Sequence, residues 1–284
     1  MKHILPARES DYATRRLEFF LKLALRKRQK EGMELSPVQL SPRKGRGCLG
    51  VSDLAKPACA LWYHLNGYLP EEADEGSQFG LDTGHVLESY ILDILEIPRS
   101  QRQVALSWPY PPAPGGRIWG HPDAFFQGPL PGTCVIECKA TGGYAFSKRL
   151  EEGPETAHFH QAFCYAAKLG ARWFAVIYAN REAKKATAFY KVFAWEVNDA
   201  ALARKAARGL FHAGFLPVLM ASCRPDPPEK PRYEFGPRGW RCRPDRSYLA
   251  RGKKVLQVGY CGFRHVCPEA ASYRQALDEV GASA

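Results

Sequence analysis

The sequence contains no apolar run that approaches the roughly 20 residues needed to span a bilayer. The longest apolar run, WFAVIYA at 173–179, has the length of a buried strand. The N-terminus has neither the continuous apolar stretch nor the small-residue cleavage site of a secretion signal. We therefore expect a soluble, cytoplasmic protein that has no membrane partner.

Acidic residues are also in short supply. The chain has 29 Asp and Glu residues against 40 Lys and Arg residues, and the resulting net charge of +11 favours a polyanionic partner such as nucleic acid. The nine Cys residues lack the spacing of a small disulfide scaffold, so in a reducing compartment they would be thiols or metal ligands. Neither observation identifies a site.

The composition changes along the chain and suggests three parts. Residues 1–50 combine an amphipathic basic helix over 12–31 with a basic linker, and we expect the helix to pack on the body rather than to act as a DNA-binding arm. Residues 51–215 carry the apolar periodicity of a folded core. Residues 216–284 form an extension that begins rich in Pro and Arg and contains several Cys residues.

Hydrophobic periodicity and turn residues predict the order of elements in the core. A short helix runs from an N-cap at Ser52 to Leu65. After it we expect a helix within 77–96, strands over 102–108, 117–126 and 133–140, a helix over 155–169 ended by Gly170, strands over 172–180 and 187–197, and a helix from Asn198 to about 212. This order predicts an α/β fold with one mixed central sheet flanked by helices.

The strand over 133–140 carries charges where burial is expected. Strand periodicity places Glu137 and Lys139 on one face, while Ile136 and Cys138 point to the other. Charged residues are seldom buried unless they are paired or bind a metal. Asp123 lies on the preceding predicted strand, and a hairpin through 127–132 would bring it opposite Glu137. Two carboxylates and a Lys would then meet at one point.

Such a group of side chains predicts a specific chemistry. Convergent carboxylates bind Mg²⁺ or Mn²⁺ through hard oxygen ligands and leave the ion several water sites. The bound ion can lower the pKa of a water molecule and can neutralise charge on a phosphate. Lys139 would orient the attacking water or stabilise the developing negative charge. The residues therefore predict hydrolysis of a phosphodiester.

Here the residues reach a resemblance to a known family. HPD at 121–123, followed by a hairpin and by ECK at 137–139, resembles the signature of the PD-(D/E)xK nucleases, and the predicted order of elements is similar to their restriction-endonuclease-like core. GHVLE places His85 on the preceding helix, which resembles the extra metal-ligand His of the RecB-type branch. QAFCY at 161–165 resembles the QxxxY motif of that branch. The resemblance covers residues 51–215.

The resemblance implies roles for these positions. It implies a metal site built from His85, Asp123, Glu137 and the main-chain carbonyl of Cys138. Gln161 and Tyr165, one helical turn apart, would hydrogen-bond the DNA backbone or stack against a base. The implied activity is that of a metal-dependent DNA exonuclease, acting on DNA ends or single strands in recombination, repair or phage DNA metabolism, where partner proteins of those processes are expected.

Several alternatives stay open. Glu88 could satisfy His85 as an ordinary helix neighbour, and Tyr165 could be a core residue. The chain could also be a DNA-binding subunit that has the fold without catalysis, or a restriction-type endonuclease. The stretch PDPPEKPR at 225–232 imitates the signature, but its prolines exclude a central strand.

The Cys residues extend the resemblance. Cys59 lies where AddB-like and CRISPR-adaptation nucleases have the first ligand of a 4Fe-4S cluster, and Cys242, Cys261 and Cys267 resemble the three ligands in the C-terminal tail of those proteins. Four thiolates could alternatively bind zinc. The remaining Cys residues outside the metal site we interpret as ordinary thiols: Cys48, Cys134, Cys164 and Cys223.

The spacing of these Cys residues departs from the family. The family places its second and third ligands two residues apart, whereas 18 residues separate Cys242 from Cys261 here. The inserted residues could form a basic hairpin that leaves the thiols together, or the cluster could be lost.

Overall fold

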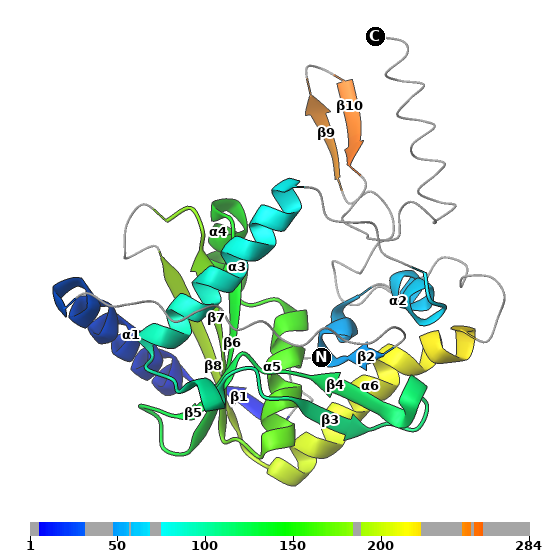
Figure 1. Cartoon of the computed structure of the whole chain (residues 1–284), viewed down its shortest axis with the longest axis horizontal. Coiled ribbons are helices and arrows are strands. Elements are labelled where there is room, and N and C mark those ends of the chain that lie inside the picture. The colour runs from blue at the N-terminus through cyan, green and yellow to red at the C-terminus, as the bar shows by residue number, and fades with distance from the viewer. Residues whose placement is uncertain are drawn as a thin grey trace.

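A computed structural model describes residues 6–31, 48–56, 58–68, 75–183, 189–222, 246–250 and 253–257 (Figure 1). The helices are α1 (Asp11–Glu31), α2 (Ala58–Leu65), α3 (Glu75–Ile94), α4 (Gly143–Glu152), α5 (Thr156–Leu169) and α6 (Ala200–Ser222). The strands are β1 (Ala7–Glu9), β2 (Leu49–Gly50), β3 (Leu106–Pro109), β4 (Arg117–Gly120), β5 (Ala124–Gln127), β6 (Thr133–Thr141), β7 (Trp173–Asn180), β8 (Tyr190–Val197), β9 (Arg246–Ala250) and β10 (Lys253–Gln257). None of the described helices is long and apolar enough to cross a membrane.

The core is a five-stranded sheet in the order β1-β8-β7-β6-β5. The pair β6–β7 is parallel and the other pairs are antiparallel, so the sheet is mixed. Helices α1 and α3 lie on one face, and α5 lies on the other with α6 packed against it (Figure 1). The prediction of a mixed sheet flanked by helices is confirmed.

Helix α1 packs on this sheet through an apolar stripe. Ala13, Leu17 and Leu21, spaced by four residues, are buried against the core, while the Lys and Arg side chains that the structure describes in this helix lie toward solvent. Tyr190 of β8 donates a hydrogen bond from its hydroxyl to the carbonyl of Glu18 at 3.1 Å. The expectation that this helix packs on the body is confirmed.

The predicted strand over 117–126 is wrong as a single element. The chain forms β4, changes sheet at His121-Pro122-Asp123, and resumes as β5. Strand β4 belongs to a second, three-stranded sheet in the order β2-β4-β3. Pro122 has no N–H to donate to a ladder, which explains why strand pairing breaks there. The expectation of one sheet is therefore corrected to a central sheet with a smaller one beside it.

Other predicted boundaries need correction. The predicted strand over 102–108 begins only at Leu106, because a 3₁₀ turn (Arg99–Gln101) and a left-handed residue, Gln103 with φ of 51°, precede it. Helix α6 is capped by Asp199 rather than Asn198, since the Asp199 carboxylate accepts hydrogen bonds from the N–H groups of Ala201 and Leu202 at 2.8 and 2.9 Å. The helix also continues beyond 212 to Ser222.

Two short helical segments also differ from the sequence prediction. Ser52 lies inside a 3₁₀ turn (Val51–Ala55), and the carboxylate of Asp53 accepts the N–H of Gly50 at 2.7 Å, so Ser52 is not the cap. Helix α4 was not among the predicted elements, and it buries Phe146 and Arg149, one turn apart. The predicted helix over 155–169 is confirmed as α5, and Gly170 ends it with φ of 64°.

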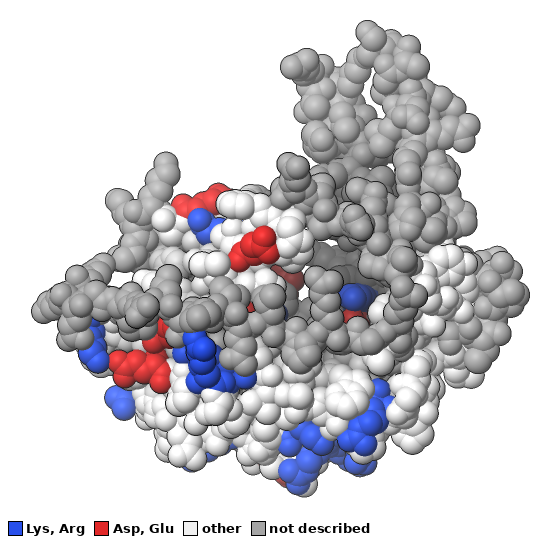
Figure 2. All heavy atoms as spheres, viewed as in Figure 1, with Lys and Arg blue, Asp and Glu red and all other residues white. Residues whose placement is uncertain are grey.

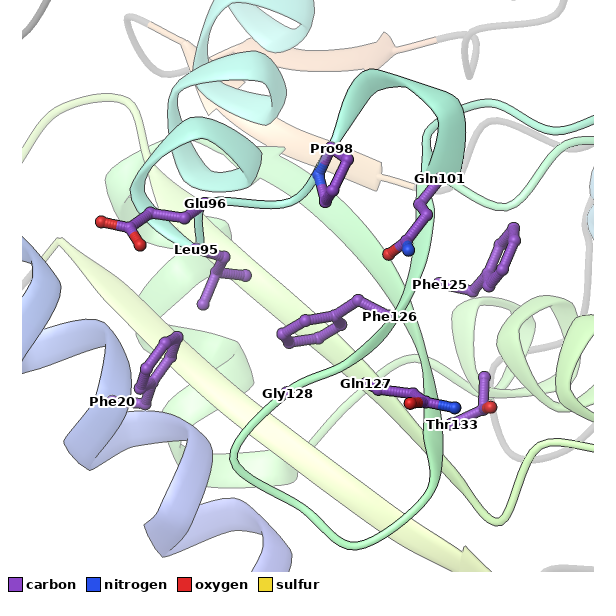
Figure 3. A pocket seen from close by; sticks show the side chains of 10 residues that line it. All are labelled: Phe20, Leu95, Glu96, Pro98, Gln101, Phe125, Phe126, Gln127, Gly128 and Thr133. Atoms are coloured by element: carbon purple, nitrogen blue, oxygen red, sulfur yellow. The ribbon is translucent and has the colours of Figure 1, made fainter.

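A pocket of about 530 Å³ lies between α1, the end of α3 and the β5–β6 hairpin (Figure 3). Phe20, Leu95 and Phe126 contribute apolar side chains to it, and Gln101 and Thr133 contribute polar ones. None of the residues predicted for the metal site lines this pocket. The pocket is therefore a separate feature of the fold.

Of the described residues in the C-terminal extension, 216–222 belong to α6 and the others form the two paired strands β9 and β10. Strands β9 and β10 pair antiparallel, with Arg246 opposite Gln257 and Ala250 opposite Lys253. The inserted residues between Cys242 and Cys261 thus contain a pair of strands, as the first of the two possibilities for this insertion requires, and whether the thiols lie together stays a prediction. The sequence PDPPEKPR at 225–232 lies outside the described residues.

Candidate active site at the open edge of the central sheet

The candidate site lies where β6 extends beyond the end of its neighbour β5. Strand β5 pairs with β6 only from Thr133 to Ile136, so the edge of β6 from Glu137 onward is open on that side. Extending the register, in which Ala124 faces Ile136, places Asp123 opposite Glu137. The carboxylate of Asp123 accepts a hydrogen bond from the Cys138 N–H at 2.6 Å. Asp123 thus lies in the link between β4 and β5 but takes the predicted cross-strand position.

The same hydrogen bond orients the main chain of Cys138. The N–H and C=O of one strand residue point to the same side of the strand. Because the Cys138 N–H points toward Asp123, its carbonyl faces the same open edge. The thiol lies on the other face in the apolar core, and burial raises the pKa of Cys138 well above its ordinary value. Only the main chain of Cys138 can therefore serve the site.

Glu137 and Lys139 form a close ion pair on the α5 side of the sheet. The Lys139 Nζ lies 2.5 Å from the Glu137 Oε1, and the side chains are 24% and 1% exposed. Among the described residues, the second carboxylate oxygen of Glu137, Oε2, is buried and has no hydrogen-bond partner. Buried polar atoms are nearly always hydrogen-bonded, so this oxygen points to a missing partner.

Two residues of the site, Glu88 and Gln103, were not predicted as site residues from the sequence. Glu88 lies on α3 three residues after His85, and the amide of Gln103 donates to its carboxylate at 2.7 Å and to that of Asp123 at 3.1 Å. The GHVLE motif contained a signal for Glu88, since residues three apart share a helix face. Nothing in the sequence indicates Gln103, whose strained left-handed backbone aims its amide between two carboxylates.

His85 lies at the rim of this group. Its side chain is 45% exposed, and its Nδ1 lies 4.0 Å from the Glu88 Oε2. Helix α3 passes closely over the sheet here, because a Cβ on Gly84 would lie 3.8 Å from the Cβ of Ala140, and Figure 1 shows the helix crossing the end of β6. The structure therefore brings His85 to the acidic side chains, but at the solvent side.

Burial and mutual repulsion disfavour the charged form of the carboxylates and raise their pKa values. Burial raises the pKa of Glu88 to about 9, and the charge of Asp123 adds to the shift. Burial also raises the pKa of Glu137 to about 8, again with help from Asp123, and raises that of Asp123 itself. For Lys139, burial acts to lower the pKa, but Glu137 and Asp123 outweigh it, and the pKa is raised. Three carboxylates thus share one ammonium group.

These residues fit a divalent cation, although they do not enclose one as they stand. In the described part of the chain, no three His, Cys, Asp or Glu side chains are grouped tightly enough to hold an ion. Their oxygens are instead held by Gln103, the Cys138 N–H and Lys139. The buried oxygen without a partner and the excess of carboxylates are what a hard cation would satisfy.

Gln161 and Tyr165 lie on the face of α5 that meets the site. The Gln161 amide donates to the Tyr165 hydroxyl at 3.3 Å. The ring of Tyr165 packs at 6.2 Å from the ring of Trp108 and is only 2% exposed, so it is not available to stack on a base. The stacking role predicted for Tyr165 is thus corrected, because the second sheet covers the ring. Its hydroxyl stays within the field of Glu137 and Asp123.

The predicted iron-sulfur ligands lie beyond what the structure describes. Cys242, Cys261 and Cys267 are outside the described residues, as is the ordinary thiol Cys223, and the side chain of Cys59 in α2 is also not described. The cluster stays a prediction. Among the ordinary thiols, Cys48 is partly buried, and Cys134 and Cys164 are buried and unpaired, in agreement with the prediction.

Comparison with known proteins gives distant structural likenesses only. No family model and no curated protein matches the chain. The crystal structure of SSO0001 aligns with 88% of this chain and 95% of its own, at 18% identity and a TM-score of 0.43. Two structures of LHK-Exo, an alkaline exonuclease from Laribacter hongkongensis, one in complex with dAMP, align with 62% of this chain and 90% of their own, at 16% identity and TM-scores of 0.42 and 0.43. Likenesses this distant establish neither a family nor an activity for this chain.

Proposed function

We propose that this protein is a metal-dependent nuclease of the PD-(D/E)xK type that hydrolyses phosphodiester bonds in DNA, as an exonuclease at ends or in single strands. One observation carries the proposal. The carboxylate of Asp123 meets the main chain beside Glu137, whose buried Oε2 has no partner among the described residues. A structural role does not explain this arrangement, since a buried polar oxygen that lacks a hydrogen-bond partner is destabilising even when the other oxygen is paired.

Each residue of the site has a separate role in this proposal. Asp123, Glu137 and the Cys138 carbonyl would hold Mg²⁺ or Mn²⁺, with His85 and Glu88 at the side of α3. When bound, such an ion supplies an activated water and charge neutralisation at a phosphate. Gln103 would orient the carboxylates by holding Asp123 and Glu88 together. Gln161 and Tyr165 would support the site from α5.

Lys139 has a role fixed by its protonation state. Because its pKa is raised, the ammonium group keeps its proton at neutral pH and cannot act as a general base. A protonated Lys can donate hydrogen bonds to a phosphate oxygen or an attacking water. We infer that Lys139 positions these groups while it remains paired to Glu137.

The surface charge agrees with a nucleic-acid substrate. Figure 2 shows Lys and Arg side chains gathered over β3 and α6, on the same face that displays the crossing of α3 over β6 in Figure 1. Contacts of this kind bind phosphates without regard to sequence and weaken as salt increases. We therefore expect non-specific binding of DNA that falls with ionic strength.

Degradation of end-labelled linear DNA, single- and double-stranded, tests the proposal. Cleavage should require Mg²⁺ or Mn²⁺ and stop with a chelator. Asp123→Asn and Lys139→Met should each lower the rate by at least about 10²-fold with DNA binding retained. Lys191→Met is a matched control, because Lys191 faces Tyr178 in register from β8 as Lys139 does from β6. It should cleave like the unchanged protein.

The other outcomes are informative. Binding without turnover in either metal would favour a non-catalytic DNA-binding subunit and contradict the proposal. Discrete fragments from circular duplex DNA would favour a restriction-type endonuclease.

For the Cys residues, we propose a 4Fe-4S cluster on Cys59, Cys242, Cys261 and Cys267. Anaerobically purified protein should then absorb near ~400 nm, whereas colourless protein containing zinc would contradict the cluster.

A further inference from the structure

A second buried charge close to the candidate site, that of Arg149, has a buried donor that no described residue satisfies. Arg149, on α4, is 7% exposed. Its Nε is buried and has no hydrogen-bond partner among the described residues. Arg149 lies ten residues after Lys139, in the helix that directly follows β6. Leaving this N–H donor of the guanidinium group unpaired in the interior is unfavourable.

The contact between Arg149 and Glu155 does not satisfy this charge. The Arg149 Nη1 lies 3.5 Å from the Glu155 Oε1, at the long end of the range for an ion pair and beyond a good hydrogen bond. The Glu155 side chain is 47% exposed, so water screens the attraction and the pair opens toward solvent on that side. An ion pair that served only to join α4 to α5 would be expected to show the bidentate geometry that Arg and a carboxylate favour.

The side chains around Arg149 connect it to Lys139. Tyr178 lies opposite Lys139 in the parallel register of β6 and β7. Its hydroxyl lies 2.8 Å from the Nδ1 of His158 and accepts the N–H of Glu155 at 3.0 Å. Burial lowers the pKa of His158 to about 3, with Lys139 and Arg149 adding to the shift, so this His stays neutral. Two cations therefore flank one neutral Tyr–His pair.

We propose that Arg149 is a phosphate subsite that binds a backbone phosphate of the nucleic-acid strand next to the phosphate held at Lys139. This proposal rests on the proposed function. The planar fork of a guanidinium group matches two phosphate oxygens, which supplies the donors' missing acceptors. Because a strand carries phosphates at regular intervals, a strand with one phosphate at Lys139 presents the next to a neighbouring cation. Glu155 holds the place of that phosphate in the free protein.

A scan with neutral phosphate analogues tests the subsite. Single-stranded oligonucleotides that carry one methylphosphonate at successive positions are bound by the Asp123→Asn protein, and affinity is measured by fluorescence anisotropy. One position should weaken binding by about tenfold, because a charge-assisted hydrogen bond is lost there. In the Asp123→Asn, Arg149→Met double variant, binding of the unmodified strand should fall by about the same factor, and the sensitive position should disappear.

Two controls separate a binding role from a structural one. Arg172→Met removes an exposed Arg that pairs with Glu196 at 2.8 Å at the opposite end of β7, and it should leave the scan unchanged. Arg149→Lys restores the charge without the planar fork, so it should recover part of the affinity if Arg149 binds phosphate. Circular dichroism and the thermal midpoint show whether each variant is folded.

Inorganic phosphate gives an independent measurement that needs no nuclease activity. Phosphate should raise the thermal midpoint of the unchanged protein and should not raise that of Arg149→Met. The subsite is wrong if folded Arg149→Met keeps the full methylphosphonate pattern and affinity while the unchanged protein degrades DNA. If the unchanged protein neither binds nor degrades DNA, the proposed function fails instead, and the response to phosphate alone then decides whether Arg149 binds anions.

Discussion

Asp93 and Arg102 form one buried ion pair of this protein, and Glu137 and Lys139 form another, but the two are built differently. Arg102 places Nη1 at 2.7 Å from the Asp93 carboxylate and donates from Nε and Nη2 to the carbonyl of Ile97. Glu137 has one oxygen paired and one, within the described residues, without a partner, and two further carboxylates lie beside it.

The difference distinguishes an ion pair that supports the fold from one that is available to bind a ligand. The Arg102 fork is filled by acceptors, so this pair holds the end of α3 to the segment before β3 and has nothing left to bind. By contrast, one buried oxygen of Glu137 has no hydrogen-bond partner among the described residues, and neither has the buried Nε of the nearby Arg149. Buried polar atoms that protein groups leave unsatisfied are where a ligand is expected.

Breaking the satisfied pair should have the largest effect on stability. Arg102→Met would leave Asp93 buried without its cation, and we expect the free energy of unfolding to fall by about 3–5 kcal/mol, measured by urea denaturation. Arg172→Met, which breaks an exposed pair with Glu196, should change it by about 0–1 kcal/mol. If Arg102→Met were as stable as Arg172→Met, burial would not distinguish the two kinds of pair.

At the carboxylates around Glu137, a bound cation should instead increase the stability of the protein. Saturating Mg²⁺ or Mn²⁺ should stabilise the unchanged protein by about 2–3 kcal/mol at a concentration near 100 times the dissociation constant, seen as a rise of several degrees in the thermal midpoint. Glu137→Gln should remove most of this rise. Glu196→Gln, at a partly exposed position of β8, is the control and should keep it. An equal rise in both variants would place the ion elsewhere.

The local part of the candidate site could be predicted from the sequence. Alternation along 133–140 was enough to place Glu137 and Lys139 on one face, and the hairpin register was enough to bring Asp123 opposite Glu137. Helix α5 and its Gly170 end also followed from local patterns. These features depend on residues close together in the chain or on one turn.

The rest depends on contacts that no local pattern encodes. Gln103 reaches Glu88 and Asp123 only because a left-handed residue turns its side chain inward, and its sequence neighbours carry no sign of that. Pro122 divided a predicted strand between two sheets, and the second sheet then covered Tyr165. The side-chain environment of Arg149 likewise arises from α4, α5 and β7 meeting, which only the tertiary fold determines.

His158 should contribute a loss of stability in acid, against which the raised pKa values of Glu88 and Glu137 act in the opposite direction. The pKa of His158 is about 3 when folded and near 6.5 when unfolded, so between these values the unfolded chain binds more protons and stability falls as pH falls. From pH 8 to pH 5 we expect a loss of about 2 kcal/mol from this residue, measured by urea denaturation. His158→Gln should not show this part of the loss in the free energy of unfolding. A second His, His160, with its pKa lowered to about 4 by burial, should contribute independently.

The pH result also tests the surroundings of Arg149. Burial is the main reason that His158 stays neutral, and the cations Lys139 and Arg149 add to it, so Arg149→Met should let the folded protein protonate His158 at a higher pH and should make the acid-induced loss smaller when the measurement is carried below pH 5. An unchanged pH dependence in both His158→Gln and Arg149→Met would contradict the described geometry. The comparison with Arg102→Met is useful, because that variant should lower stability at every pH.

The smallest effect is expected behind Tyr165, where no charge is involved. A Cβ on Gly120 would lie 2.6 Å from the Tyr165 Cε1 and 3.1 Å from its hydroxyl, so Gly120→Ala must displace the ring. We expect a loss of about 1–2 kcal/mol, the usual result of overpacking by one methyl group, together with slower DNA cleavage, because the displaced hydroxyl lies in the field of Glu137 and Asp123. Gly209→Ala, in α6 with nothing within 4 Å, is the control and should be neutral or stabilising. If Gly120→Ala lost stability but cleaved DNA at the normal rate, Tyr165 would support the fold and not the site, and the group without satisfied partners would end at Glu137 and Lys139.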